Sequence, residues 1–329
     1  MLGITELRCG PLAQDAHHVS SLRVEDSVAD HQCTFQVGGI TIRVEGAGLR
    51  DVGLDSTVLP FRIAPRSPDI RIQVERVSHL LPSMGFPLFD SGSVWRLFQS
   101  QNDFQFDFSS PAVGKYPYKR LLVDNKFRRA RLLLNTEVFT EENHTSPLEY
   151  PLDELLIMHR LTQERAIELH GVGIAGLGGT SNLFIGHSGA GKSTTARLWT
   201  SLHNVEILSD DRIIVREETR PDDTAPGHAT QIFMYGTPWH GEAHFALPQR
   251  APLQRIFILE HGFGNVITPL SPVQAVSEIF ARSFVPFHRH EYLDHALTFL
   301  ESLAASIPCY RYSFEPDQRA VETILQFND

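Results

Sequence analysis

"LFIGHSGAGKSTTARLW", residues 183–199, is the stretch that decides the fold. An apolar run, Leu183 to Ile185, stops at Gly186 and is followed by two more glycines, a lysine and hydroxyl side chains. The pattern G-x-x-x-x-G-K-[ST] is typical of a phosphate-binding loop, in which glycines let backbone N–H groups turn toward phosphate oxygens. The flanking residues favour a buried strand before the loop and a helix after it, and the positive N-terminal end of such a helix attracts the same anion.

Two side chains of this loop have chemical roles that follow from their types. Lys192 would reach the β and γ phosphates of a nucleotide, and the Ser193 hydroxyl would hold Mg²⁺. The sequence therefore predicts that the chain binds a nucleoside triphosphate together with its metal.

A pair of carboxylates follows the next apolar run. In "VEILSDDRIIVR", residues 205–216, Asp210 and Asp211 come after an apolar strand, where a phosphate-loop enzyme needs an acidic side chain for Mg²⁺. Successive strand side chains point to opposite faces, so the two carboxylates cannot both lie on the metal in the same way. We expect one to serve the metal and the other to act as a general base toward an attacking hydroxyl.

His170 is the third candidate, in "ELHGVGIAG", residues 168–176. If this strand pairs antiparallel with the loop strand, His170 lies close to Gly186, beside the γ phosphate or oriented toward an aspartate. The same stretch spells G-x-G-x-x-G, but we expect a turn and a strand after it, whereas a dinucleotide fingerprint needs a helix there.

The whole chain limits the class of protein. Its 329 residues, 42% hydrophobic, suit one large domain or two medium ones. A formal charge of -10 without a long basic run argues against a nucleic-acid surface, and no segment is apolar for long enough to span a membrane. Cys9, Cys33 and Cys309 are few and widely spaced, which favours a reducing, cytoplasmic location.

Three regions follow one another along the chain. Residues 1–33 are polar and predict a flexible arm. Residues 34–145 predict a β-rich, antiparallel domain because of their period-two stretches, "TFQVGGITIRVEG", "DIRIQVERV", "SVWRLFQSQNDFQFDFS" and "KRLLVDNKFRRARLLLN". Residues 146–329 predict a mixed α/β domain with a helix over 152–168, strands at 168–176, 182–186 and 205–216, and a helix at 317–327.

These motifs together resemble the HPr kinase/phosphorylase family, whose fold is akin to ATP-type phosphoenolpyruvate carboxykinase. The shared run is His170-Gly171, then "GHSGAGKS", then "LSDDRI". The chain is most similar to the HPr-kinase-related proteins of peptide-tailoring clusters, through "YPLDELL" (150–156), "SDDR" (209–212), "YGTPW" (235–239) and "PLQRIFILE" (252–260). The family's Glu-Ile-Arg-Gly signature is not found in "QIFMYGTPWHGE", which argues against phosphorolysis of a phosphoprotein.

The resemblance implies an α/β (mixed α+β) fold, an HPr kinase/phosphoenolpyruvate carboxykinase-like P-loop domain preceded by the β-rich domain. It implies Ser193 and Asp210 for Mg²⁺, Asp211 as the base and His170 as a site residue, beside Lys192. It implies that ATP is bound by the loop residues Gly186, His187, Ser188, Gly189, Ala190, Gly191, Lys192, Ser193 and Thr194.

We therefore expect an ATP- and Mg²⁺-dependent kinase acting on a hydroxyl, a serine of a peptide or protein. Arg250 and Glu242 are further candidates for contact with phosphate or substrate. Two alternatives stay open: a small-molecule phosphotransferase of the carboxykinase-like type, and a non-catalytic nucleotide-binding interaction module. The acceptor and a homo-oligomeric state are also left open by the sequence.

Overall fold

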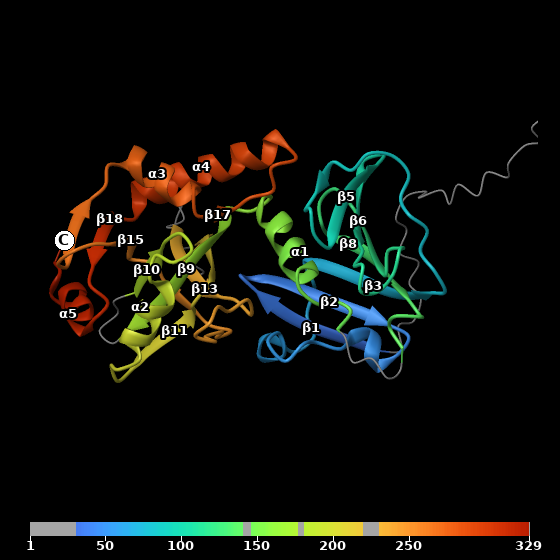
Figure 1. The fold of residues 1–329 in the computed structure, drawn as a ribbon, viewed down its shortest axis with the longest axis horizontal. Helices are drawn as coiled ribbons and strands as arrows, with labels where there is room; N and C mark the ends of the chain where they lie inside the picture. The colour runs from blue at the N-terminus through green and yellow to red at the C-terminus, as the bar shows by residue number, and fades with distance from the viewer. Residues whose placement is uncertain (1–30, 141–145, 177–180, 220–229, 329) are drawn as a thin grey trace, which may run out of the picture.

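The computed structural model of the chain describes residues 31–140, 146–176, 181–219 and 230–328. In this part the fold is mixed α and β, with two β-sheets and helix α1 (Leu152–Leu161) between them (Figure 1). Most of the expected arm, the turn expected after Gly176 and Cys9 lie outside the described residues. Within the described residues, no helix has the length and apolar character needed to cross a bilayer.

Period-two alternation builds the first sheet, as predicted. In β3 (Ile70–Val77) the first five residues alternate between buried and partly exposed. The strand order is β1-β2-β3-β8-β7-β6-β5-β4. The other strands are β1 (His31–Val37), β2 (Ile40–Gly46), β4 (Phe89–Asp90), β5 (Trp95–Ser100), β6 (Asp103–Phe108), β7 (Lys119–Val123) and β8 (Arg129–Asn135).

This sheet is not wholly antiparallel, which corrects the sequence-based expectation. Strand β3 pairs parallel with both β2 and β8. A parallel pair needs a crossover of a dozen or more residues. The segment between Gly46 and Ile70, with the short helices η1 (Leu49–Val52) and η2 (Leu59–Phe61), provides the crossover from β2 to β3.

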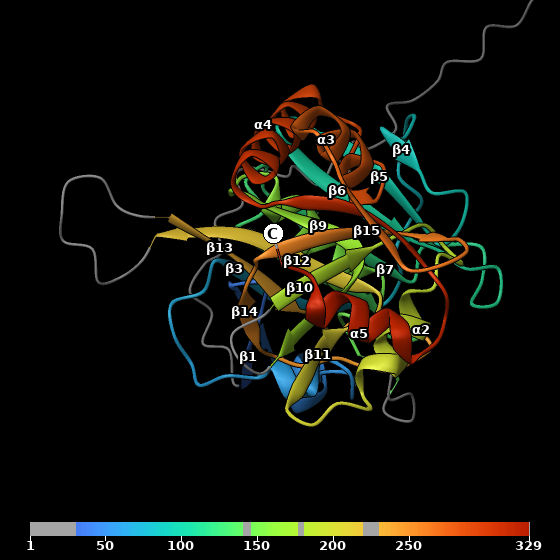
Figure 2. The same ribbon diagram turned by 90° about the vertical axis from the view of Figure 1, so that its left-hand side faces the viewer.

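The second sheet carries the predicted loop. Its order is β14-β13-β12-β9-β10-β15-β18-β16, and β11 and β17 also pair with β9. Its strands are β9 (Ala166–Gly176), β10 (Ser181–Ile185), β11 (Val205–Ser209), β12 (Arg212–Thr219), β13 (Thr230–Gly236), β14 (Arg250–Pro252), β15 (Arg255–His261), β16 (Val266–Pro269), β17 (Ser283–Phe284) and β18 (Cys309–Phe314). Figure 2 shows helices on both faces: α2 (Lys192–Trp199) and α5 (Gln318–Gln326) on one, α3 (Pro272–Phe280) and α4 (His290–Ser306) on the other.

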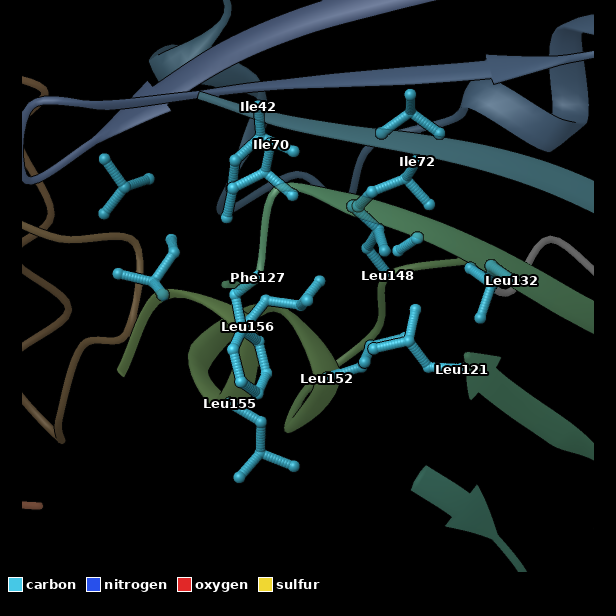
Figure 3. Close-up of a cluster of buried hydrophobic side chains, with 14 of the residues drawn as sticks. Ile42, Ile70, Ile72, Leu121, Phe127, Leu132, Leu148, Leu152, Leu155 and Leu156 are labelled. Carbon is cyan, nitrogen blue, oxygen red and sulfur yellow. The ribbon is translucent and has the colours of Figure 1, made fainter. Parts of the chain in front are cut away.

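Helix α1 joins the two sheets through one apolar core. Its side chains Leu152, Leu155 and Leu156 lie beside Ile70 and Phe127 of the first sheet's region (Figure 3). Buried side chains of the second sheet and its loops, Ile214, Tyr235 and Trp239, belong to the same cluster. The helix is therefore held between the sheets, and its polar residues are close to the predicted site.

Two element boundaries differ from the sequence-based expectation. Helix α1 ends at Leu161, where the Thr162 hydroxyl donates to the carbonyl of His159 at 2.7 Å, and β9 already begins at Ala166. The stretch 205–216 forms two strands, β11 and β12, which are separated by Asp210 and Asp211. Both strands pair with β9. Burial on both faces of β9 removes the alternation that would have marked its start.

Candidate active site

The loop that joins β10 to α2, residues 186–191, is here called the glycine loop. Strand β10 pairs antiparallel with β9, which confirms the expected hairpin, and the Gly186 N–H donates to the carbonyl of His170 at 3.3 Å. A Cβ on Gly186 would lie 2.7 Å from the Cβ of Ala190. Gly191 has a φ of +97°, which favours glycine, and a Cβ there would lie 2.5 Å from Cζ of Phe314. The loop conformation thus requires glycine at both ends.

Lys192 closes this loop from inside. Its Nζ donates to the carbonyls of Gly186 and His187, each at 3.0 Å. Burial lowers the pKa of the ammonium group to about 8, and the nearby charge of Asp211 acts against this shift. The charge of Lys192 is therefore held within the loop and within electrostatic range of Asp211.

The crest of the glycine loop is open to solvent. His187, Ser188 and Gly189 are exposed, and a Cβ on Gly189 would have no neighbour within 4 Å. Nε2 of His261, at the end of β15, donates to the carbonyl of Gly189 at 2.6 Å and holds the crest from the side. Ala190, Ser193 and Thr194 are partly exposed at the start of α2, so backbone and hydroxyl groups are accessible there.

The aspartate pair separates into two environments. Asp210 is buried, and its carboxylate accepts hydrogen bonds from the backbone N–H groups of Gly241 at 3.0 Å, Ala243 at 2.8 Å and Phe245 at 3.1 Å. It faces the 241–245 loop, and its oxygens already have three donors. Asp210 thus holds the 241–245 loop, a role that the sequence did not predict.

Asp211 points instead toward His170. Its Oδ1 lies 2.9 Å from Nε2 of His170, and its backbone carbonyl accepts from the N–H of Gly171 at 3.0 Å. Burial acts to raise the pKa of Asp211, but the hydrogen bond from His170 and the charges of Arg212 and Lys192 hold it below its usual range. Asp211 and the glycine loop therefore both meet β9 at His170 and Gly171.

Arg212 connects this pair to helix α1. Its Nε lies 2.8 Å from Oε1 of Glu154 and 3.5 Å from Oε1 of Glu168, and it also pairs with Asp211. Its guanidinium lies 4.0 Å from the centre of the Phe284 ring. Burial raises the pKa of Glu168 well above its usual range, and the adjacent Glu154 adds to this effect. One arginine thus faces two acids, and burial disfavours the charged form of Glu168.

The "YGTPW" loop is fixed against the same region. Nε1 of Trp239 donates to Oδ2 of Asp153 at 2.8 Å, and the Thr237 hydroxyl donates to the carbonyl of Arg212 at 2.7 Å. Glu242 lies between two residues whose N–H groups bind Asp210, and its side chain is exposed. Glu242 therefore stays near the aspartate pair, as the sequence suggested.

Arg250 lies elsewhere. It is on β14, which is four strands away from β10 in the sheet order, or about 19 Å at a strand spacing of about 4.8 Å. Its guanidinium pairs with Glu218 and stacks on the Phe233 ring at 4.4 Å. The structure does not bring Arg250 to the glycine loop.

Several residues of the site were not predicted. His261 holds the loop crest, Glu154 and Glu168 hold Arg212, and Arg282 acts on the pKa of Lys192. The sequence feature that could have indicated Glu154 and Glu168 is a charged residue within an apolar stretch, as in "YPLDELL" and "AIELHG".

A scan against protein-family models and a search of curated proteins both return no match to this chain.

Proposed function

We propose that the protein is an ATP- and Mg²⁺-dependent kinase with an HPr kinase-like P-loop domain, and that it transfers the γ-phosphate to a serine of a peptide or protein. The observation that carries this proposal is the 2.9 Å contact between His170 and Asp211 at the point where the glycine loop meets β9. A phosphate-binding pattern and an ionised carboxylate at one place are what hydroxyl phosphorylation needs.

The reaction would begin at the acceptor hydroxyl. Asp211 takes its proton, the oxygen forms a bond to the γ-phosphorus, and the bond to the bridging oxygen breaks to release ADP. His170 orients the Asp211 carboxylate and keeps it ionised, since its hydrogen bond lowers the pKa of that group. Lys192 and the loop N–H groups stabilise the charge that spreads over the phosphoryl oxygens.

The residues present fit a triphosphate with its metal. The loop crest is exposed, Gly189 has free space around it, and α2 directs its N-terminal end at the loop. The Thr195 hydroxyl is bound to the carbonyl of Gly191 at 3.0 Å, whereas no hydrogen bond of the Ser193 hydroxyl is found among the described residues. Ser193 would therefore hold Mg²⁺ together with the phosphates, and the ion would neutralise charge on their oxygens.

One predicted role changes in this proposal. Asp210 orders the 241–245 loop in place of binding the metal, because three backbone N–H groups already donate to its carboxylate. Glu242 stays a candidate for substrate contact, because it lies on this ordered loop.

We further propose a reducing, cytoplasmic location, which the free, buried thiols of Cys33 and Cys309 support.

The test is phosphate transfer by the purified full-length protein with γ-labelled ATP and Mg²⁺. Serine peptides, free serine and other small hydroxyl compounds are offered side by side. Label in peptides supports the proposal. Label only in small compounds favours a small-molecule phosphotransferase, and ATP binding without any transfer favours a nucleotide-binding interaction module.

A further inference from the structure

An apolar pocket lies beside the candidate active site. Its volume is about 190 Å³, and its walls come from three parts of the chain: Phe89 and Trp95 of the first sheet, Met158 of α1, and Phe284 and Phe287 of the segment after α3. Figure 1 shows α1 between the two sheets, with β17 at the side of the second sheet that faces α1. An apolar cavity of about 150 Å³ binds benzene, so this space is large enough for an aromatic side chain.

Phe284 belongs to both the pocket and the site. Strand β17 pairs with β9 so that Phe284 lies opposite Glu168, two residues before His170. The centres of the Phe284 and His170 rings are 6.1 Å apart, and the Arg212 guanidinium covers the same phenyl ring. One wall of the pocket therefore packs against His170 and Arg212, the two residues that pair with the proposed base Asp211.

The rim of the pocket is apolar and open to water. Phe287 is 65% exposed and Phe89 is 38% exposed. Trp95 stacks on Phe89 with ring centres 5.1 Å apart, which fixes one side of the opening. Water at such a surface is released when an apolar group binds, which favours association with an apolar ligand.

We infer that the acceptor is a peptide segment with a large apolar side chain, aromatic by preference, two residues from the phosphorylated serine, and that this side chain enters the pocket. The inference rests on the proposed kinase function. An extended peptide advances about 3.3 Å per residue and alternate side chains point the same way, so the second residue is about 6.6 Å away. The pocket and the site share the Phe284 ring, so the nearest side chain on the serine's own side of the peptide is the one that reaches the pocket.

A role for the first sheet follows. Phe89 on β4 and Trp95 on β5 supply the side of the pocket that the second sheet does not cover. The β-rich domain then selects the acceptor, while the second sheet carries the phosphate chemistry. Substrate choice and transfer are thus assigned to different parts of one chain.

The experiment uses peptides with one fixed serine and random flanking residues. The full-length protein is given this library with MgATP, and the phosphorylated peptides are sequenced. In parallel, a library with alanine at the serine position is captured on the protein without ATP, which measures binding independently of transfer. We expect both pools to be enriched in Phe, Trp, Tyr or Leu two residues from the fixed position.

A selected peptide and its alanine counterpart then test the pocket directly. Loss of the large side chain should weaken binding about tenfold or more. The double variant Phe89→Ser and Phe287→Ser should remove most of this difference, with folding checked by thermal unfolding. Phe263→Ser is the matched control, because Phe263 is 99% exposed on the loop between β15 and β16 and is not part of the pocket.

The outcomes separate the two proposals. Aromatic-selective binding without transfer supports the pocket and contradicts the kinase function. Transfer without any preference for apolar neighbours supports the kinase function and overturns the pocket inference. The pocket inference is also overturned if no peptide binds, or if the double variant abolishes self-association of the chain and leaves peptide selection unchanged.

Discussion

Nε2 of His170 lies 2.9 Å from Oδ1 of Asp211, although 40 positions separate the two residues in the sequence. They meet because β12 pairs with β9, which places Arg212 opposite His170. The next residue of β9, Gly171, pairs with Ile185, the last residue before the glycine loop. A single strand, β9, thus brings the carboxylate, the histidine and the loop together.

Replacing His170 by Ala should shift the acidic limb of the plot of kcat/KM against pH. Burial favours a raised pKa for Asp211, and the hydrogen bond from His170 is the first of the groups that lower it. Without His170 the pKa of Asp211 rises, so the base becomes protonated at higher pH. The limb of kcat/KM against pH should therefore shift upward, whereas the variant of the exposed His203, His203→Ala, should leave it in place. An unmoved limb in His170→Ala would show that His170 does not tune this base.

ATP affinity should fall as the pH rises above about 8. Burial lowers the pKa of Lys192 to about 8 in the free protein, while bound phosphates favour its charged form. Below this pH the ammonium is already present, and above it binding must take up a proton, which costs up to about tenfold in affinity per pH unit. Calorimetric Kd values for MgATP on either side of pH 8 measure the slope. Lys192→Arg keeps its charge and should show a flat profile, and an equal slope in both proteins would contradict the assignment.

Asp210→Ala should destabilise the fold more than it affects metal binding. Three backbone N–H groups would lose a buried acceptor, at about 1–3 kcal/mol for each one left unsatisfied. We expect a loss of about 3 kcal/mol or more in denaturant unfolding, and a smaller loss for Asp210→Asn, whose amide oxygen still accepts. Unchanged stability together with weakened Mg²⁺ affinity would restore the metal role that the sequence suggested.

Gly191→Ala should lower the free energy of unfolding by more than the left-handed backbone conformation alone explains. A non-glycine residue at φ +97° pays about 1–2 kcal/mol, and the new Cβ would also lie 2.5 Å from Cζ of Phe314. Gly264→Ala is the matched control, because its φ is +76° and a Cβ there has no neighbour within 4 Å. The free energy of unfolding should fall more for Gly191→Ala than for Gly264→Ala. Combining Gly191→Ala with Phe314→Leu should recover part of that loss. Equal losses at the two glycines would show that Phe314 does not constrain the loop.

The local part of the site could be predicted from sequence. A strand, a glycine loop and a helix follow one another in the pattern, and two successive strands form a hairpin that places His170 beside Gly186. These relationships depend on neighbouring residues and on the alternation of side chains. They did not require knowledge of the rest of the sheet.

The remaining features depend on distant segments. The Asp210 carboxylate is held by the 241–245 backbone, which lies some 30 residues later and offers it three N–H donors. Arg250 lies across the sheet because β12 and β13 are placed between β14 and β9. Parallel pairing of β3 likewise depends on a long crossover that carries no alternation. Sequence spacing contains no direct signal for such pairings.

The most direct test of the central claim is single-turnover transfer of labelled γ-phosphate by the wild-type protein and by Asp211→Asn, with ATP binding measured in both. If Asp211 is the base beside the bound triphosphate, the variant still binds ATP and transfers phosphate about 10²–10⁴-fold more slowly. Transfer by Asp211→Asn at the wild-type rate would contradict the account.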